Sequence, residues 1–182
     1  MIDLGTKAPD FSLPRVTDGT LVSRSEFENG KGLLVVFLSR HCPFVKHIQA
    51  RLTEVGNEYR NRGIGVVAIC ANDAERYPED GPESLNEMVR ELGIEFPVLF
   101  DETQEVARAY SAACTPDFFL FDARMELVYR GQFDSSRPSK DTPVTGEDLT
   151  AAMDAVLAGE PVSGPQVPSM GCSIKWKETA GA

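Results

Sequence analysis

The sequence predicts an α/β fold in which helices flank a central mixed β-sheet. Two nearly continuous apolar runs, residues 33–39 and 64–70, are typical of strands that are covered on both faces. Between them, residues 43–62 carry apolar side chains at helical spacing, and Gly63 ends the segment. A strand, a helix and a strand of these lengths form a right-handed crossover with parallel strands, so both strands end at the same edge of the sheet.

The remaining elements follow in order along the chain. Residues 8–13 and 20–23 predict an N-terminal β-hairpin, because Asp18 and Gly19 between them are typical turn residues. Residues 72–82 are polar and contain proline, which indicates a loop at the edge where sites of open α/β sheets usually lie. The later elements are a helix at 84–92, a strand at 96–100, a helix at 104–110, antiparallel strands at 118–121 and 127–129, and an amphipathic helix at 147–158.

The composition indicates one globular domain, residues 1–158, followed by an extended C-terminal tail, residues 159–182. A chain of 182 residues with 42% hydrophobic content suits a single core. The tail has too little apolar content to fold alone, yet it carries Cys172 and the only tryptophan, Trp176. Because an extended chain spans about 3.3 Å per residue, Cys172 can reach the active-site edge of its own domain or of a neighbouring subunit. We expect the tail to dock there.

The charge excludes several classes of partner. The formal net charge of -10 argues against nucleic acid and against an anionic membrane surface, since both require clustered positive charge. No apolar run approaches the roughly 20 residues that span a bilayer, and residues 1–5 do not resemble the start of a signal peptide. We therefore expect a cytoplasmic protein without nucleic-acid or membrane partners. Whether it forms a homodimer is open.

Cys42 is the residue that most directly suggests a chemistry. It follows the first apolar strand and precedes Pro43, a residue that favours the first turn of a helix. A cysteine at a strand-to-helix turn lies against free N–H groups and the positive end of the helix dipole, which lowers the pKa of the thiol and favours the nucleophilic thiolate. Potential cations that could deepen this shift surround it in sequence: Arg40, His41, Lys46 and His47.

The other three cysteines have no spacing that indicates a zinc site or a compact disulfide framework. Cys70 ends an apolar strand, and we expect it in the core. Cys114 and Cys172 remain open between packing and redox chemistry. Ser39 could donate a hydrogen bond to the Cys42 sulfur or simply end the strand, and His41 could act as a base or a cationic partner. No metal site is expected.

A combination of features over roughly residues 3–158 resembles the thioredoxin fold. It consists of the apolar strand, the motif Ser39–Lys46, the crossover helix, and Thr115–Pro116 before the apolar run 117–121. The most similar branch is peroxiredoxin-like and is grouped with the alkyl hydroperoxide reductase and thiol-specific antioxidant family. Within that group, His41–Val45 and Pro168–Trp176 look similar to a set of thioredoxin-like proteins of poorly defined activity.

The chain departs from both well-known branches of this fold. Thioredoxins carry a second cysteine three residues after the first, where this chain has Val45, and a buried aspartate where it has Val36. Peroxiredoxins carry a threonine or serine matching Ser39, but their proline four residues earlier is replaced by Val35. Exchange through a C-x-x-C dithiol is therefore excluded, and peroxidase chemistry stays open.

The resemblance also implies where the reaction takes place. In thioredoxin folds the proline that matches Pro116 follows a cis peptide bond and packs beside the attacking sulfur. The backbone before it, at Thr115, pairs with an extended substrate. The resemblance therefore implies that Cys114 lies near Cys42, which makes it a candidate resolving thiol. Cys172 of the tail is the other candidate.

These observations predict a thiol-dependent oxidoreductase of the antioxidant type. The Cys42 thiolate attacks a hydroperoxide, and the resulting sulfenic acid condenses with Cys172 or Cys114 to a disulfide. An external thiol reductant such as a thioredoxin then opens this disulfide, and neither a metal nor an organic cofactor is required. Two alternatives remain: thiol–disulfide exchange with a protein client, and a non-catalytic binding module or redox sensor.

Overall fold

The computed structural model describes residues 2–178 and has the expected central mixed sheet. Of the proposed domain 1–158 and tail 159–182, residue 1 and residues 179–182 therefore lie outside the described part. The sheet has five strands in the order β5-β4-β3-β7-β8. Their bounds are β3 Gly32–Phe37, β4 Ile64–Cys70, β5 Val98–Phe100, β7 Asp117–Asp122 and β8 Leu127–Tyr129.

The predicted crossover is confirmed. Helix α1 (Pro43–Asn61) connects β3 to β4, and the two strands are parallel with Leu34 opposite Val66. Strand β5 extends the parallel half of the sheet, whereas β7 pairs with β3 antiparallel and β8 pairs with β7 antiparallel. Every residue of β3 is buried because the strand lies at the centre of the sheet with both faces covered. The parallel strands therefore end at one edge, just before Cys42.

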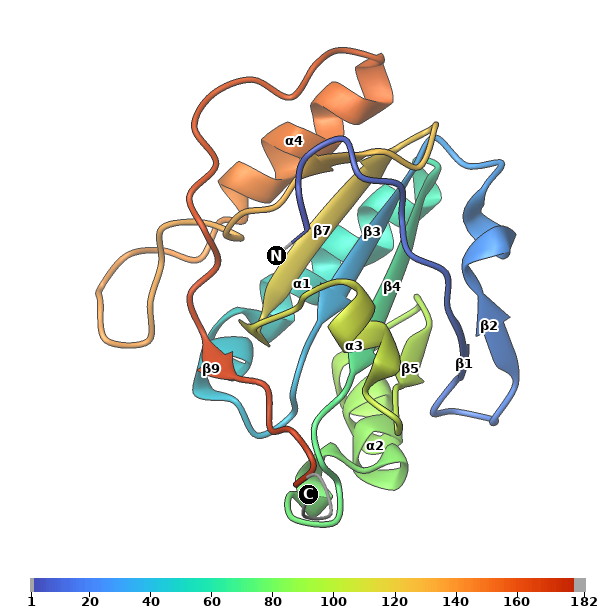
Figure 1. The fold of residues 1–182 in the computed structure, drawn as a ribbon. Helices are drawn as coiled ribbons and strands as arrows, with labels where there is room; N and C mark the ends of the chain where they lie inside the picture. The colour runs from blue at the N-terminus through green and yellow to red at the C-terminus, as the bar shows by residue number, and fades with distance from the viewer. Residues whose placement is uncertain (1, 179–182) are drawn as a thin grey trace.

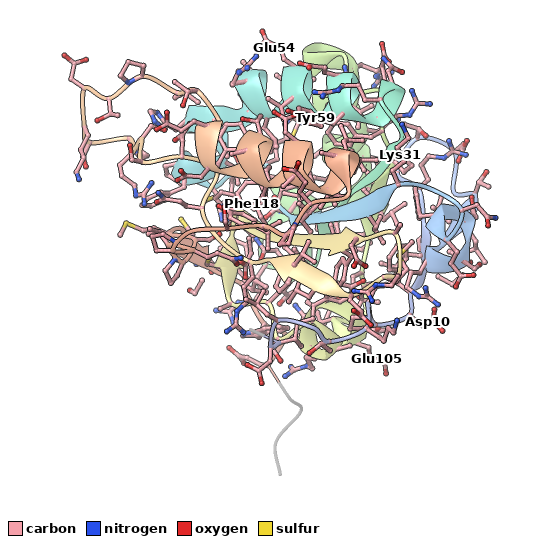
Figure 2. All side chains as sticks on the ribbon, turned by 90° about the horizontal axis from the view of Figure 1, so that it is seen from above. Asp10, Lys31, Glu54, Tyr59, Glu105 and Phe118 are labelled. Carbon is pink, nitrogen blue, oxygen red and sulfur yellow. The ribbon has the colours of Figure 1, made fainter. Side chains whose placement is uncertain are left out.

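Two layers cover the sheet (Figure 1). Helices α1, α2 (Pro82–Leu92) and α4 (Glu147–Ala158) pack on one face. Helix α3 (Glu105–Ala109) packs on the other, next to the predicted N-terminal hairpin of β1 (Ser12–Pro14) and β2 (Leu21–Ser23). Figure 2 shows this sandwich from above, with Tyr59 on the α1 side and Glu105 on the α3 side. Among the described residues, no helix has the length and apolarity needed to cross a membrane.

The tail runs back over its own domain rather than away from it. After α4 it descends along the side of the sheet and forms β9 (Cys172–Ser173), as Figure 1 shows. Strand β9 pairs antiparallel with β6 (Cys114–Thr115), the short strand before Pro116. Ile174, directly after β9, is only 3% exposed. The tail therefore docks at the carboxyl edge of the parallel strands, where Cys42 follows β3.

Candidate active site at Cys42

Cys42 is the N-cap residue of α1. Its backbone is extended (φ -68°, ψ 122°), Pro43 occupies the first turn, and the Cys42 carbonyl accepts the N–H of Lys46 at 2.9 Å. The side chain is 0% exposed. The sulfur therefore lies buried against the free N–H groups of the first helical turn, which is the placement that the sequence predicts.

The pKa of the Cys42 thiol is lowered, although burial alone works in the opposite direction. Burial is the largest single influence and raises the pKa, but it is outweighed by hydrogen bonds from the Thr115 side chain, the Val45 N–H and Cys172. When protonated, the Cys42 Sγ donates to the Thr115 carbonyl at 3.1 Å. Neighbouring hydrogen-bond donors therefore favour a thiolate in a site that water does not reach.

The peptide bond between Thr115 and Pro116 is cis, as the resemblance implies. Thr115 is buried and lies in β6, and its carbonyl oxygen faces the Cys42 sulfur. The other edge of this short strand holds β9 of the tail. The place where the resemblance expects an extended substrate is thus occupied by the chain itself.

Cys172 lies directly opposite Thr115 in the β6–β9 pair and is half-buried. Burial, followed by its hydrogen bond with Cys42, raises the pKa of the Cys172 thiol to about 11. The hydrogen bond between the two thiols acts on their pKa values in opposite directions, because a donor that stabilises the Cys42 thiolate also keeps the Cys172 proton in place. The structure therefore brings together one thiol that ionises readily and one that does not.

Gly171 allows the tail to pass this close. A Cβ atom at this position would lie 2.0 Å from the Thr115 carbonyl oxygen and 3.1 Å from the Pro116 nitrogen. No other residue fits there without moving the tail, because real Cβ contacts are not shorter than 3.0 Å. Only glycine therefore fits before Cys172, because the tail approaches the cis peptide so closely.

Hydrogen bonds hold the tail on both sides of Cys172. Before it, the Ser169 hydroxyl donates to the Gly131 carbonyl at 2.8 Å. After it, the Ile174 N–H donates to the Ala113 carbonyl at 3.2 Å. The backbone of Lys175 is then clamped by Asn72, Asp73 and Gln104, at 2.8, 2.9 and 2.9 Å.

Cys114 is the other candidate resolving thiol. It is half-buried, and burial, followed by the nearby Asp117 carboxylate, raises its pKa to about 12. In the β6–β9 pair it lies opposite Ser173. Side chains alternate along a strand, so Cys114 points away from the face that Thr115 shares with Cys172. Its Sγ lies 3.5 Å from the Pro116 carbonyl. The geometry favours Cys172 over Cys114 as the partner of Cys42.

Arg40 and Ser39 do not have the partners that the sequence suggested. The Arg40 guanidinium lies against α2, where it binds Glu87 at 2.9 Å and Glu91 at 3.1 Å. These carboxylates and the Ser84 carbonyl, rather than the Cys42 sulfur, satisfy its charge. The Ser39 hydroxyl is buried and donates to the carboxylate of Asp80 at 2.9 Å. Of the four cations near Cys42 in sequence, Arg40 therefore binds the carboxylates of α2.

Asp80 is a site residue that the sequence did not single out. Its side chain is 0% exposed, and its carboxylate receives the Arg40 N–H and the Asn72 amide, each at 2.7 Å. The same carboxylate lies 2.7 Å from His41 Nδ1, and the His41 ring stacks on Tyr77. The loop 72–82 was expected at this edge, but nothing in its polar sequence distinguishes Asp80 from its acidic neighbours.

Asn72 connects this carboxylate to the tail. Its amide nitrogen donates to Asp80, and its amide oxygen accepts the N–H of Lys175 at 2.8 Å. One short network therefore holds both the loop that carries Cys42 and the segment that follows Cys172.

Cys70 is a core residue, as predicted. It is 0% exposed at the end of β4, and burial, followed by the Asp80 charge, raises the pKa of its thiol far above the usual range. Within residues 2–178, no three His, Cys, Asp or Glu side chains converge in a way that could hold a metal ion.

The fold and the site together define a thioredoxin-like protein with a buried cysteine at the start of a helix. The structure is similar to that of a thiol:disulfide interchange protein DsbE from Chlorobium tepidum, with 25% identity and a TM-score of 0.66 over 86% of this chain and 99% of that one. The family model for AhpC/TSA matches residues 4–130. The chain belongs to the AhpC/TSA family.

Two solved structures resemble the whole chain, including the tail. An uncharacterized conserved protein from Geobacillus kaustophilus has 52% identity and a TM-score of 0.96 over 99% of this chain and 95% of that one. A hypothetical protein from Sinorhizobium meliloti has 50% identity and a TM-score of 0.95 over 100% of this chain and 97% of that one.

The curated relatives carry the name thiol-disulfide oxidoreductase ResA. The protein from Halalkalibacterium halodurans is 26% identical over 124 residues, which is 68% of this chain and 65% of that relative. The protein from Bacillus subtilis is 24% identical over 127 residues, covering 70% of this chain and 66% of that relative. The matched segment thus spans slightly less than two thirds of these relatives.

Proposed function

We propose that the protein is a thiol–disulfide oxidoreductase whose redox couple is Cys42 and Cys172. The observation that carries this proposal is the position of Cys172, opposite Thr115, whose carbonyl oxygen lies 3.1 Å from the Cys42 sulfur. The names of the ResA relatives and of the DsbE neighbour support the same reaction class. These two cysteines take the place of the C-x-x-C dithiol. The chain lacks that dithiol because Val45 stands where its second cysteine would be.

The two thiols have complementary roles in this reaction. The Cys42 thiolate attacks a substrate disulfide, a mixed disulfide forms on Cys42, and one substrate thiolate leaves. Cys172 then gives up its proton and attacks the Cys42 sulfur, which releases the second substrate thiolate and leaves a Cys42–Cys172 disulfide. The substrate gains two electrons from the protein. An external thiol reductant later supplies two electrons that reduce the Cys42–Cys172 disulfide.

Hydroperoxide reduction is the second candidate. Membership of the AhpC/TSA family and the lowered pKa of Cys42 favour it. In this reaction the Cys42 thiolate attacks one peroxide oxygen, the O–O bond breaks, and the other oxygen leaves as water or an alcohol after it takes up a proton. The resulting sulfenic acid condenses with the Cys172 thiol, which releases water and forms the same disulfide. The Ser39 hydroxyl, which the peroxiredoxin resemblance would direct to this step, donates to Asp80 instead. Disulfide exchange is therefore our first choice.

Rapid mixing of the reduced protein with either oxidised glutathione or hydrogen peroxide tests both candidates. After alkylation and digestion, mass spectrometry identifies the linked cysteines, and Cys172→Ser and Cys114→Ser serve as matched variants. We expect a Cys42–Cys172 linkage that forms faster per mole of oxidised glutathione than of peroxide and persists in Cys114→Ser. A faster reaction with peroxide would favour the second candidate, and a Cys42–Cys114 linkage would contradict the proposed couple.

A further inference from the structure

The backbone next to the cis peptide is already paired within the chain. Thr115 lies opposite Cys172 in the β6–β9 pair, and its carbonyl oxygen lies 3.1 Å from the Cys42 sulfur. Just before β6, the Ala113 carbonyl accepts the Ile174 N–H at 3.2 Å. An extended polypeptide binds to a strand edge through main-chain hydrogen bonds of this kind. The tail therefore occupies the edge of β6 that a polypeptide substrate would need.

The tail is held on this edge by further contacts after β9. The Lys175 N–H donates to the Asn72 side chain at 2.8 Å. The Lys175 carbonyl accepts the Asp73 N–H and the Gln104 amide, each at 2.9 Å. Ile174 is only 3% exposed. A polypeptide that pairs with β6 has to break such contacts first, whereas a substrate without a long backbone does not.

A small cavity lies beside Pro116. It has a volume of about 20 Å³, enough for a single water molecule, and its lining includes Phe44, His47 and Met170. Met170 is 57% exposed and has a flexible side chain, so it can move while the backbone of the tail stays in place. Because Cys42 is 0% exposed, a substrate reaches its sulfur only after neighbouring groups move. Beside Pro116, movement of side chains alone makes room for a small molecule.

His47 gives this cavity a polar atom that the protein leaves without a partner. Its Nε2 is buried and accepts or donates no hydrogen bond among residues 2–178. Buried polar atoms are nearly always paired, so an unpaired one calls for a ligand or a water molecule. When the proton is on Nε2, this atom donates to a carboxylate. The Asp134 carboxylate in the same lining is already bound by Ser136, Thr145 and Gly146.

We propose that the substrate is a low-molecular-weight disulfide with a carboxylate, which binds beside Pro116 with its carboxylate on His47, rather than a polypeptide paired with β6. The inference deepens the proposed function and rests on it. The Cys42 thiolate attacks one sulfur of R–S–S–R, R–S⁻ leaves, and the other R–S group stays on Cys42 as a mixed disulfide. Cys172 then loses its proton and displaces this group from the Cys42 sulfur. The two protein thiols supply two electrons, and the proton of Cys172 passes to one of the two released R–S⁻ groups.

A comparison of two disulfides tests the substrate class. Oxidised glutathione is the small substrate, and a short unstructured peptide whose central cysteine carries glutathione is the polypeptide substrate. The full chain is used as Cys172→Ser, in which the reaction stops at the mixed disulfide on Cys42, and mass spectrometry follows that adduct. We expect the adduct to form at least about tenfold faster with oxidised glutathione. An equal or faster reaction with the peptide would overturn the inference.

Ile174→Ala, made in the same Cys172→Ser chain, tests the part played by the tail. It removes a buried anchor next to β9, so β6 becomes available and the preference for oxidised glutathione falls at least about threefold. Leu13→Ala is the matched control, because Leu13 is buried in the same apolar cluster but belongs to β1, and this variant keeps the preference. A preference that is unchanged in Ile174→Ala, or equally lowered in both variants, would show that the tail does not set it.

His47→Leu tests the cavity. A hydrogen bond to a charged group contributes about 1.5–3 kcal/mol, so the concentration of oxidised glutathione at half-maximal rate rises roughly tenfold or more while the maximal rate stays the same. The reaction with 2-hydroxyethyl disulfide, which is small and has no carboxylate, is unaffected. Gln49→Leu changes the same helix outside this cavity and serves as the control. An unaltered half-saturating concentration in His47→Leu would refute the site.

The two proposals fail in different ways. If no disulfide forms an adduct on Cys42, the proposed function is wrong. If the adduct forms equally well with the peptide and with oxidised glutathione, only the substrate class is wrong.

Discussion

Two cysteines of this protein are equally buried and have opposite chemistry. Cys42 and Cys70 are each 0% exposed and lie at the same edge of the sheet, after β3 and at the end of β4. The pKa of Cys42 is lowered, whereas burial and then the Asp80 charge raise the pKa of Cys70. Burial alone therefore does not determine whether a thiol in this fold is reactive.

The difference arises from the backbone around each sulfur. Cys42 precedes a helix, so the N–H of Val45 is free to bond its sulfur, and Thr115 and Cys172 add further donors. Cys70 ends a strand that is paired on both sides, and its Sγ lies 3.8 Å from the carbonyl oxygen of Asp80. The helix start and its neighbours supply Cys42 with several donors, whereas Cys70 has the Asn72 N–H as the only donor among the contacts that shift its pKa, and this N–H does not offset burial.

Exchange of each sulfur for oxygen tests this contrast most strongly. Cys42→Ser removes the nucleophile, and we expect the rate of oxidised glutathione reduction to fall by roughly 10³-fold or more, as for other nucleophiles that act within a unit. Cys70→Ser keeps the rate within about twofold and costs about 1 kcal/mol of unfolding free energy, because it alters only packing and a weak contact. Steady-state turnover and urea denaturation measure the two effects. A Cys70→Ser variant that loses activity while remaining folded would place Cys70 in the reaction and contradict the comparison.

Much of this contrast could be predicted from sequence because it depends on local order. The apolar runs at 33–39 and 64–70 and the helix at 43–62 indicate that Cys42 starts a helix and Cys70 ends a strand, and the structure confirms both. The cis bond before Pro116 follows from the resemblance and is also confirmed.

The remaining parts of the site depend on contacts between distant segments. The length of the tail allowed Cys172 to lie almost anywhere along the sheet edge, so its register opposite Thr115 could not be derived from spacing. Proximity in sequence made Arg40 one of four potential cations for Cys42, but its long side chain reaches the carboxylates of α2. Asp80 lacked any local signal, because its partners at the Cys42 loop, Ser39 and Arg40, come about forty positions earlier.

Asp117 extends the comparison to a buried carboxyl group with few donors. It is 0% exposed next to Pro116, its Oδ2 accepts the Ala113 N–H at 3.1 Å, and its Oδ1 has no hydrogen-bond partner among residues 2–178. Burial, opposed only in part by the Ala113 N–H, raises its pKa from 3.8 to about 6. Like Cys70, this group is buried without enough donors to favour its charge.

Asp117→Asn should therefore stabilise the protein near neutral pH. One pKa unit corresponds to about 1.4 kcal/mol, so the neutral amide removes an ionisation penalty of at most roughly 3 kcal/mol. The folded state binds its proton more tightly than the unfolded state, so the wild-type protein loses stability as pH rises from about 4 to 6. The gain from the variant is complete above pH 6 and disappears below about pH 4. Urea denaturation at several pH values measures it, and a variant that is less stable at neutral pH would show that the carboxylate is satisfied.

Asp80 allows a further test of the contrast between Cys42 and Cys70, since it contacts the loop of one and shifts the pKa of the other. Its carboxylate holds the Ser39 hydroxyl and the Arg40 N–H of the Cys42 loop, and its charge raises the pKa of Cys70. Through Asn72 it also supports the tail that carries Cys172. In Asp80→Asn one acceptor oxygen becomes a donor that faces other donors.

We expect this variant to weaken the pairing of Cys42 with Cys172. A hydrogen bond to a charged group contributes about 1.5–3 kcal/mol, and partial loss of this support corresponds to a roughly tenfold lower equilibrium constant for the disulfide in glutathione redox buffers. Asp134→Asn is the matched control, because within residues 2–178 that buried carboxylate binds Ser136, Thr145 and Gly146 and no residue near Cys42 or Cys172. Equal losses in the two variants would indicate a general loss of stability. A loss confined to Asp80→Asn would show that this one buried carboxylate positions the reactive pair.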